Sequence, residues 1–129
     1  MDHSFQIERL QMSISSLRGD IRQTEQEIER LQTAKSTLIQ EQQFLHNDKA
    51  ATKQPELSYD MWRGKETEEH EQKRFQLEMS YSYSQEQLEG IITTIETKIS
   101  DLRNSINNSY QSIQSKQSSI DSLRRAQKN

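Results

Sequence analysis

The sequence has few residues of several types, and each shortage excludes a class of structure. It contains no cysteine, which excludes disulfides, thiolate metal sites and thiol redox chemistry. One proline and three glycines in 129 residues leave few points at which a helix must end. Only 29% of the residues are hydrophobic, well below the average domain, so little conventional globular core can form.

Long apolar runs are also missing. No stretch approaches the roughly 18 consecutive apolar residues of a membrane span, and the N-terminal residues lack the basic and apolar regions of a secretory signal peptide. We therefore expect a chain made in the cytosol, without a membrane span. The 17 basic and 20 acidic residues give a net charge of −3 and are interspersed, which argues against a nucleic-acid partner.

The few apolar residues of the first 50 positions are regularly spaced. Isoleucine recurs every seven residues and leucine fills the alternate positions, as at the a and d positions of a coiled coil. This first seam consists of Ile7, Leu10, Ile14, Leu17, Ile21, Ile28, Leu31, Leu38 and Leu45. Polar side chains occupy three further seam positions, at Thr24, Lys35 and Gln42, where they weaken packing and fix register. The pattern predicts a helix over about 4–51.

A second seam runs through the C-terminal part in one unbroken register. It consists of Leu88, Ile92, Ile95, Ile99, Leu102, Ile106, Ile113, Ile120 and Leu123. Ser109 and Lys116 interrupt its d positions. This pattern predicts a second helix, from about 65 to about 127.

The stretch around Pro55 carries no helical stripe. Proline lacks the amide hydrogen and disfavours helix in the residue before it, so a bend is expected at about 52–64. The predicted fold class is all-α, a long antiparallel two-helix hairpin that forms a single domain over 1–129.

Five residues between 75 and 83 alternate with polar residues, which is the period of a half-buried strand. They are Phe75, Leu77, Met79, Tyr81 and Tyr83. In a helix they would fall on two faces, with Leu77 and Tyr81 opposite the other three. A helix with one face on its hairpin partner and one on another chain is favoured over a local strand, because a strand would have no partner.

Other apolar residues lie outside both seams, including Phe5, Met12, Ile39, Phe44 and Ile91. A two-helix hairpin leaves such residues partly exposed, so we expect association with further helices.

No catalytic or metal-binding pattern is present. The three histidines, His3, His46 and His70, are scattered, and there is no phosphate-binding loop or nucleophile elbow. Glu66 and His70 share a helix face, but a solvated charged turn is the better interpretation. We expect a protein that is not an enzyme and needs no cofactor.

The bend carries Trp62-Arg63-Gly64, and Phe75 follows eleven residues after the glycine, in an acidic chain without cysteine. In these features the chain resembles the Trp-x-Gly helical hairpins of bacterial type VII secretion, most of all the longer YwqH-like proteins associated with LXG toxins. The resemblance covers the whole chain in architecture and only a few positions in motif.

The resemblance implies a chaperone or targeting factor that binds the helical N-terminal region of a cognate LXG toxin, or a second small helical partner. Residues on the bend and on the start of the second helix are the candidates for recognition: Trp62, Gly64, Phe75, Leu77, Met79 and Tyr81. It also implies a cytoplasmic location, with export alongside the partner as a further option.

One family feature is absent from this sequence, the C-terminal tyrosine followed four residues later by an acid. Tyr81, Tyr83 and Tyr110 are each followed at that spacing by glutamine, which suggests that a partner completes the export signal. Two alternatives stay open: a secreted homodimeric Trp-x-Gly effector, and a structural coiled-coil scaffold.

Overall fold

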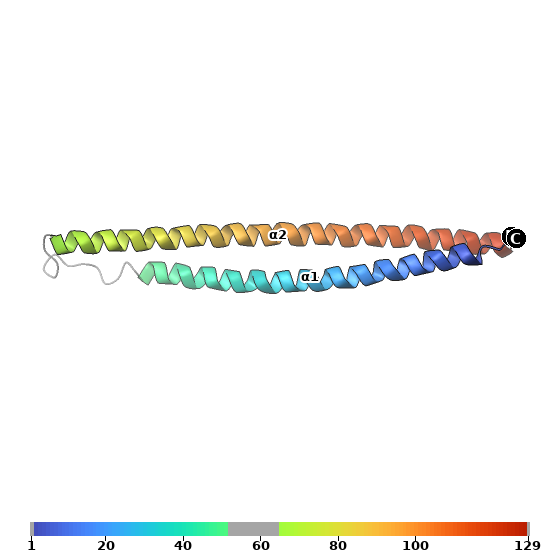
Figure 1. Cartoon of the computed structure of the whole chain (residues 1–129), viewed down its shortest axis with the longest axis horizontal. Coiled ribbons are helices and arrows are strands. Elements are labelled where there is room, and N and C mark those ends of the chain that lie inside the picture. Colours follow the sequence, from blue (N-terminus) through green and yellow to red (C-terminus); the bar gives the residue numbers. More distant parts are fainter. Residues whose placement is uncertain (1, 52–64, 129) are drawn as a thin grey trace. The chain divides into compact units, whose positions relative to one another are not determined.

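The structure consists of two long helices. This computed structural model describes residues 2–51 and 65–128, which form α1 (Ser4–Ala51) and α2 (Lys65–Lys128), with no strand in either range (Figure 1). The sequence places the helices at about 4–51 and about 65–127, and the all-α hairpin fold is confirmed. The expected bend at 52–64 lies outside the described residues.

The chain divides into two compact units. Unit 1 is formed by Met1–Gln32 and Thr97–Asn129, and unit 2 by Thr33–Glu96. Within each unit, a stretch of α1 runs beside a stretch of α2 in the opposite direction (Figure 1). Each unit is therefore a separate segment of antiparallel helix pair, and each is described by itself below.

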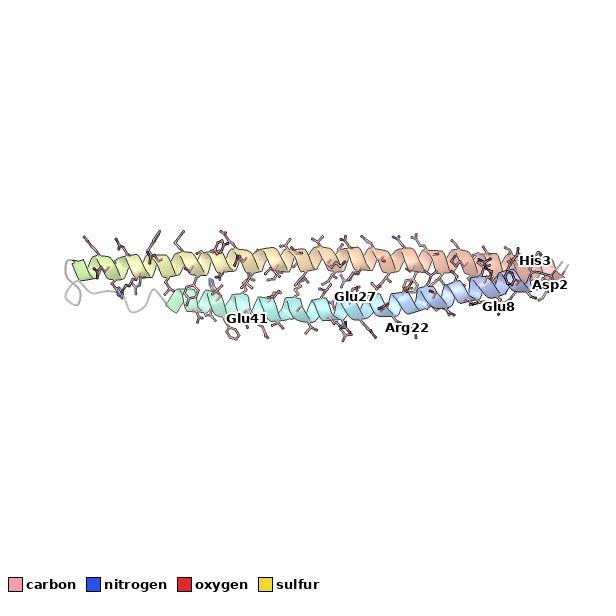
Figure 2. The ribbon with its side chains drawn as sticks, in the orientation of Figure 1. Asp2, His3, Glu8, Arg22, Glu27 and Glu41 are labelled. Atoms are coloured by element: carbon pink, nitrogen blue, oxygen red, sulfur yellow. The ribbon has the colours of Figure 1, made fainter. Side chains whose placement is uncertain are left out.

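The start of α1 is capped by Asp2 in unit 1. Its Oδ1 atom accepts hydrogen bonds from the Ser4 amide at 2.9 Å and the Ser4 hydroxyl at 2.6 Å. The Gln127 side-chain amide near the end of α2 donates to the same oxygen at 3.0 Å, and Figure 2 shows Asp2 and His3 at this end. The first amides of a helix lack intrahelical acceptors, so Asp2 satisfies one of them and also joins the two helix ends.

The hydrogen bonds to Asp2 favour its charged form. The Ser4 side-chain hydrogen bond is the largest cause that lowers the pKa of Asp2 from 3.8, and the Ser4 backbone hydrogen bond is the next. At this same end of the unit, Arg125 and Lys128 lie in the last turn of α2, where cations offset the helix dipole.

The core of unit 1 is a stack of isoleucines. Ile7, Ile14 and Ile120 form a buried cluster, and Ile120 is only 1% exposed. The partly buried residues packed against this cluster are Leu10, Ile113 and Leu123. All six occupy a or d positions of the two heptad seams, so the packing follows from the seven-residue spacing.

Candidate partner-binding surface

Burial along both helices follows the heptad positions. Every buried hydrophobic side chain among the described residues is an isoleucine at an a position: Ile7, Ile14, Ile21, Ile28, Ile92, Ile99 and Ile120. The other seam residues are half-buried: Leu10, Leu17, Leu31, Leu38, Leu45, Leu88, Ile95, Leu102, Ile106, Ile113 and Leu123. A pair of helices covers only a narrow stripe on each member, so the d row and the a residues Ile106 and Ile113 keep part of their surface in contact with solvent.

The two units divide the buried isoleucines unequally. Six of the seven lie in unit 1, and Ile92 alone lies in unit 2. The reason lies in the sequence of α1, because its a positions change from isoleucine to Lys35 and Gln42 at the point where unit 2 begins. Both polar side chains are half-buried.

Polar contacts between the helices replace apolar packing in unit 2. The Lys35 ammonium nitrogen lies 3.3 Å from Glu96 Oε1, and the Gln42 amide donates to Glu89 Oε2 at 2.8 Å. Seven residues forward along α1 thus correspond to seven residues backward along α2, as an antiparallel register requires. The ion-pair side chains are 34% and 52% exposed, so the pair contributes at most about 1 kcal/mol.

The seam of α2 continues towards its N-terminus in a form that sequence analysis missed. Steps of seven back from Ile92 and Leu88 reach Gln85 and Glu78 at a positions, and Tyr81 and Arg74 at d positions. All four of these side chains are half-buried. An apolar repeat does not reveal this part of the seam, because three of its four side chains are polar or charged.

Residues 75–83 are helical, so the alternative of a local strand is wrong. Among the predicted recognition residues, Tyr81 is half-buried at a seam position, and Leu77 is 46% exposed. Phe75 is 63% exposed and Met79 is 57% exposed. Tyr83, on the same face, is 63% exposed. Trp62 and Gly64, the remaining two recognition residues, lie outside the described residues.

The exposed apolar residues gather in unit 2. Ten large hydrophobic side chains are exposed in the described part of the chain, and seven of them belong to unit 2: Ile39, Phe44, Phe75, Leu77, Met79, Tyr83 and Ile91. Unit 1 carries the other three, Phe5, Met12 and Tyr110. The Arg9 guanidinium covers part of Phe5, at 5.8 Å from the ring centre. Unit 2 therefore combines a seam interrupted by polar residues with most of the exposed large apolar side chains of the described residues.

Unit 1 also contains a shallow groove. It is lined by Arg18, Ile21, Arg22, Glu25 and Tyr110. The d position next to Tyr110 holds the small side chain of Ser109, which is half-buried and fills less of the seam than a leucine would. Three of the five residues that line the groove are charged and the groove is open to solvent, so it does not resemble the enclosed apolar cavities that hold small-molecule ligands.

The described residues contain neither a membrane-spanning helix nor a cluster of metal-binding side chains. Within residues 2–51 and 65–128, neither helix holds an apolar stretch of the length needed to cross a bilayer. The same residues contain no cluster of three or more His, Cys, Asp or Glu that could hold a metal ion.

Comparison with known proteins identifies one family. The sequence model of the family described as YwqH-like matches residues 5–125 of this chain. The match spans both helices and the segment between them. No curated protein and no solved structure matches the chain.

Proposed function

Because the chain belongs to the YwqH-like family, we propose that it is an accessory protein of type VII secretion. In this role it binds the helical N-terminal region of a cognate LXG toxin and targets that toxin for export. The resemblance at Trp62-Arg63-Gly64 and the family membership support the same proposal. The activity is binding alone, with no catalytic step and no cofactor.

The observation that carries the proposal is the exposed apolar surface of unit 2. Phe75, Met79 and Tyr83 are each more than half exposed, although burial of such a side chain contributes about 1.5–3 kcal/mol. Exposed apolar patches of this kind mark surfaces where another protein binds. Helical partners fit best, because an amphipathic helix can extend a helix pair into a three- or four-helix bundle.

Co-expression tests this proposal directly. If an LXG toxin is encoded beside this chain, the full chain is produced together with the N-terminal helical region of that toxin, and the two are purified through a tag on the toxin. We expect a stable complex that survives size-exclusion chromatography. Matched controls are the corresponding region of an unrelated LXG toxin, and a tagged coiled coil of the same length.

A secretion assay tests the targeting role. Deletion of the gene for this chain should abolish export of the cognate toxin and leave export of other type VII substrates unchanged. Absence of a complex, together with normal toxin export after deletion, would contradict the proposal. Export of the chain itself as a homodimer in the absence of any toxin would favour the secreted-effector alternative instead.

A further inference from the structure

Unit 2 exposes a continuous apolar stripe on α2. Phe75, Met79 and Tyr83 are spaced by four residues, which places them on one helix face. All three are between 57% and 63% exposed, while Tyr81, the d-position residue between Met79 and Tyr83, is half-buried in the seam. The stripe therefore faces away from α1, and we call these three residues the outer stripe.

The surroundings of the outer stripe are acidic. The sequence of unit 2 contains twelve Asp or Glu against seven Lys or Arg, a net charge of −5. The described side chains of unit 1 include eight carboxylates against ten Lys or Arg, a net charge of +2. On α2, within two turns of the stripe (residues 68–90), six glutamates stand against two cations, Lys73 and Arg74. The total charge of −3 is therefore the sum of an acidic unit 2 and a slightly basic unit 1.

This charge selects among possible occupants of the stripe. A second copy of the chain would bring its own unit 2 acids against these carboxylates if the two stripes met, and like charges across an interface oppose association. A helix with lysine or arginine beside its apolar residues would meet opposite charge instead. Complementary charge raises the association rate and suppresses wrong partners.

We infer that the outer stripe of unit 2 docks a cationic amphipathic helix of another protein, with Lys or Arg flanking its apolar face. This inference deepens the proposed function, because it states which segment of the chain binds and what chemistry the toxin's helical region presents to it. The polar a positions Lys35 and Gln42 fit the same role, since a weakly packed helix pair can adjust its spacing when a third helix docks.

Two synthetic peptides test the charge requirement. Both carry the same leucine and isoleucine stripe at helical spacing, one with lysine and the other with glutamate at the flanking positions. We expect the full chain to bind the lysine peptide at least about tenfold more tightly, by fluorescence anisotropy at low salt. This preference should shrink at about 1 M salt, where the Debye length is roughly 3 Å.

The chain offers a closely matched pair of variants for locating the site. Substitution of the outer stripe by Phe75→Ala, Met79→Ala and Tyr83→Ala removes one phenylalanine, one methionine and one tyrosine from unit 2. The control variant removes the same three residue types from unit 1, at Phe5, Met12 and Tyr110, which are 71%, 66% and 53% exposed. Alanine favours helix, so both triple variants should keep the far-ultraviolet circular dichroism of the parent.

We expect the outer-stripe variant to lose at least about tenfold in affinity for the lysine peptide and for the toxin region, and the control variant to stay within about twofold. The inference is overturned if the lysine peptide does not bind, if both peptides bind equally, or if both triple variants weaken binding to the same extent. It is also overturned if the outer-stripe variant changes the oligomeric state of the isolated chain, which would make a second copy the occupant.

Different results would contradict the proposed function and the proposed docking site. If the toxin region binds the parent and the outer-stripe variant equally well, the proposed function stands and the docking site is wrong. If the lysine peptide binds through the outer stripe while no toxin region binds, the docking site stands and the proposed partner is wrong.

Discussion

At the scale of single residues, the isoleucines at a positions contribute most of the burial. Ile21 is 4% exposed and Ile99 is 6% exposed, and both belong to unit 1. Both side chains are buried, so a charge placed there would lose most of its contact with water.

Replacing a buried seam isoleucine by a charged residue should strongly lower the free energy of unfolding. Ile21→Asp and Ile99→Asp should each lower the free energy of unfolding by at least about 3 kcal/mol, because each loses apolar packing and buries a carboxylate. Glu27→Lys, at an exposed position of the same helix, should change it by less than about 0.5 kcal/mol. Thermal melts followed by circular dichroism measure all three. Similar stability of the three variants would refute the heptad assignment.

The lowered pKa of Asp2 predicts that the stability of the folded chain depends on pH. Its pKa is lowered in the folded chain, chiefly by the Ser4 hydrogen bond, so its contribution to stability is complete above 3.8, the ordinary value. That contribution is lost as the pH falls through the lower, folded-state pKa. Asp2→Ala should therefore lower the Tm slightly at neutral pH, and the difference from the parent should vanish in strong acid. A difference that stays constant over this range would rule out the carboxylate as its source.

At the scale of elements, α1 changes character along its length. Its first part carries isoleucine at every a position, whereas Lys35 and Gln42 take the a positions in unit 2. Each polar residue makes one contact with α2, to Glu96 and Glu89 respectively. These contacts specify register at a cost in stability, since a partly exposed ion pair stabilises less than a packed isoleucine.

Replacement of the polar a positions should therefore stabilise the pair. Lys35→Ile combined with Gln42→Ile should raise the free energy of unfolding by about 1–2 kcal/mol, because two apolar side chains join the seam beside half-buried Ile95 and Leu88. Urea denaturation measures the change. Lys73→Ile, at an exposed position of α2, is the matched control and should not stabilise. A loss of stability in the double variant would show that the polar contacts are worth more than packing.

At the scale of the whole molecule, the resemblance assigns recognition to Trp62 and Gly64 as well as to residues early in α2, of which Phe75 and Met79 belong to the outer stripe. The two assignments are separable by experiment, because binding of a toxin and its export are different measurements. If Trp62 belongs to an export signal, its side chain should matter for secretion and not for the stability of the complex.

Trp62→Ala should accordingly leave helicity and toxin binding near the parent values and reduce toxin secretion to background. Secretion is measured in the culture supernatant, and binding by co-purification. A purely structural tryptophan would instead lower the Tm and weaken binding in proportion. Normal secretion with Trp62→Ala and Gly64→Ala combined would remove the recognition role altogether.

The sequence by itself determined the two helices and the positions of the isoleucines that become buried. A seven-residue apolar repeat lines up along one stripe of a helix that packs on another helix, so Ile7 and Ile120 could be placed in a seam from the sequence. The family resemblance also came from sequence alone, since Trp62-Arg63-Gly64 is a local motif.

Only the tertiary structure showed that the seam of α2 continues through residues 75–83, and so decided which face of this stretch is exposed. Periodicity separates Tyr81 from the outer stripe, but the two faces are equally apolar, and the rotation of α2 about its axis depends on what α1 presents to it. In unit 2, α1 presents Lys35 and Gln42, and α2 meets them with Glu96 and Glu89. This polar register places Tyr81 in the seam and leaves Phe75, Met79 and Tyr83 exposed.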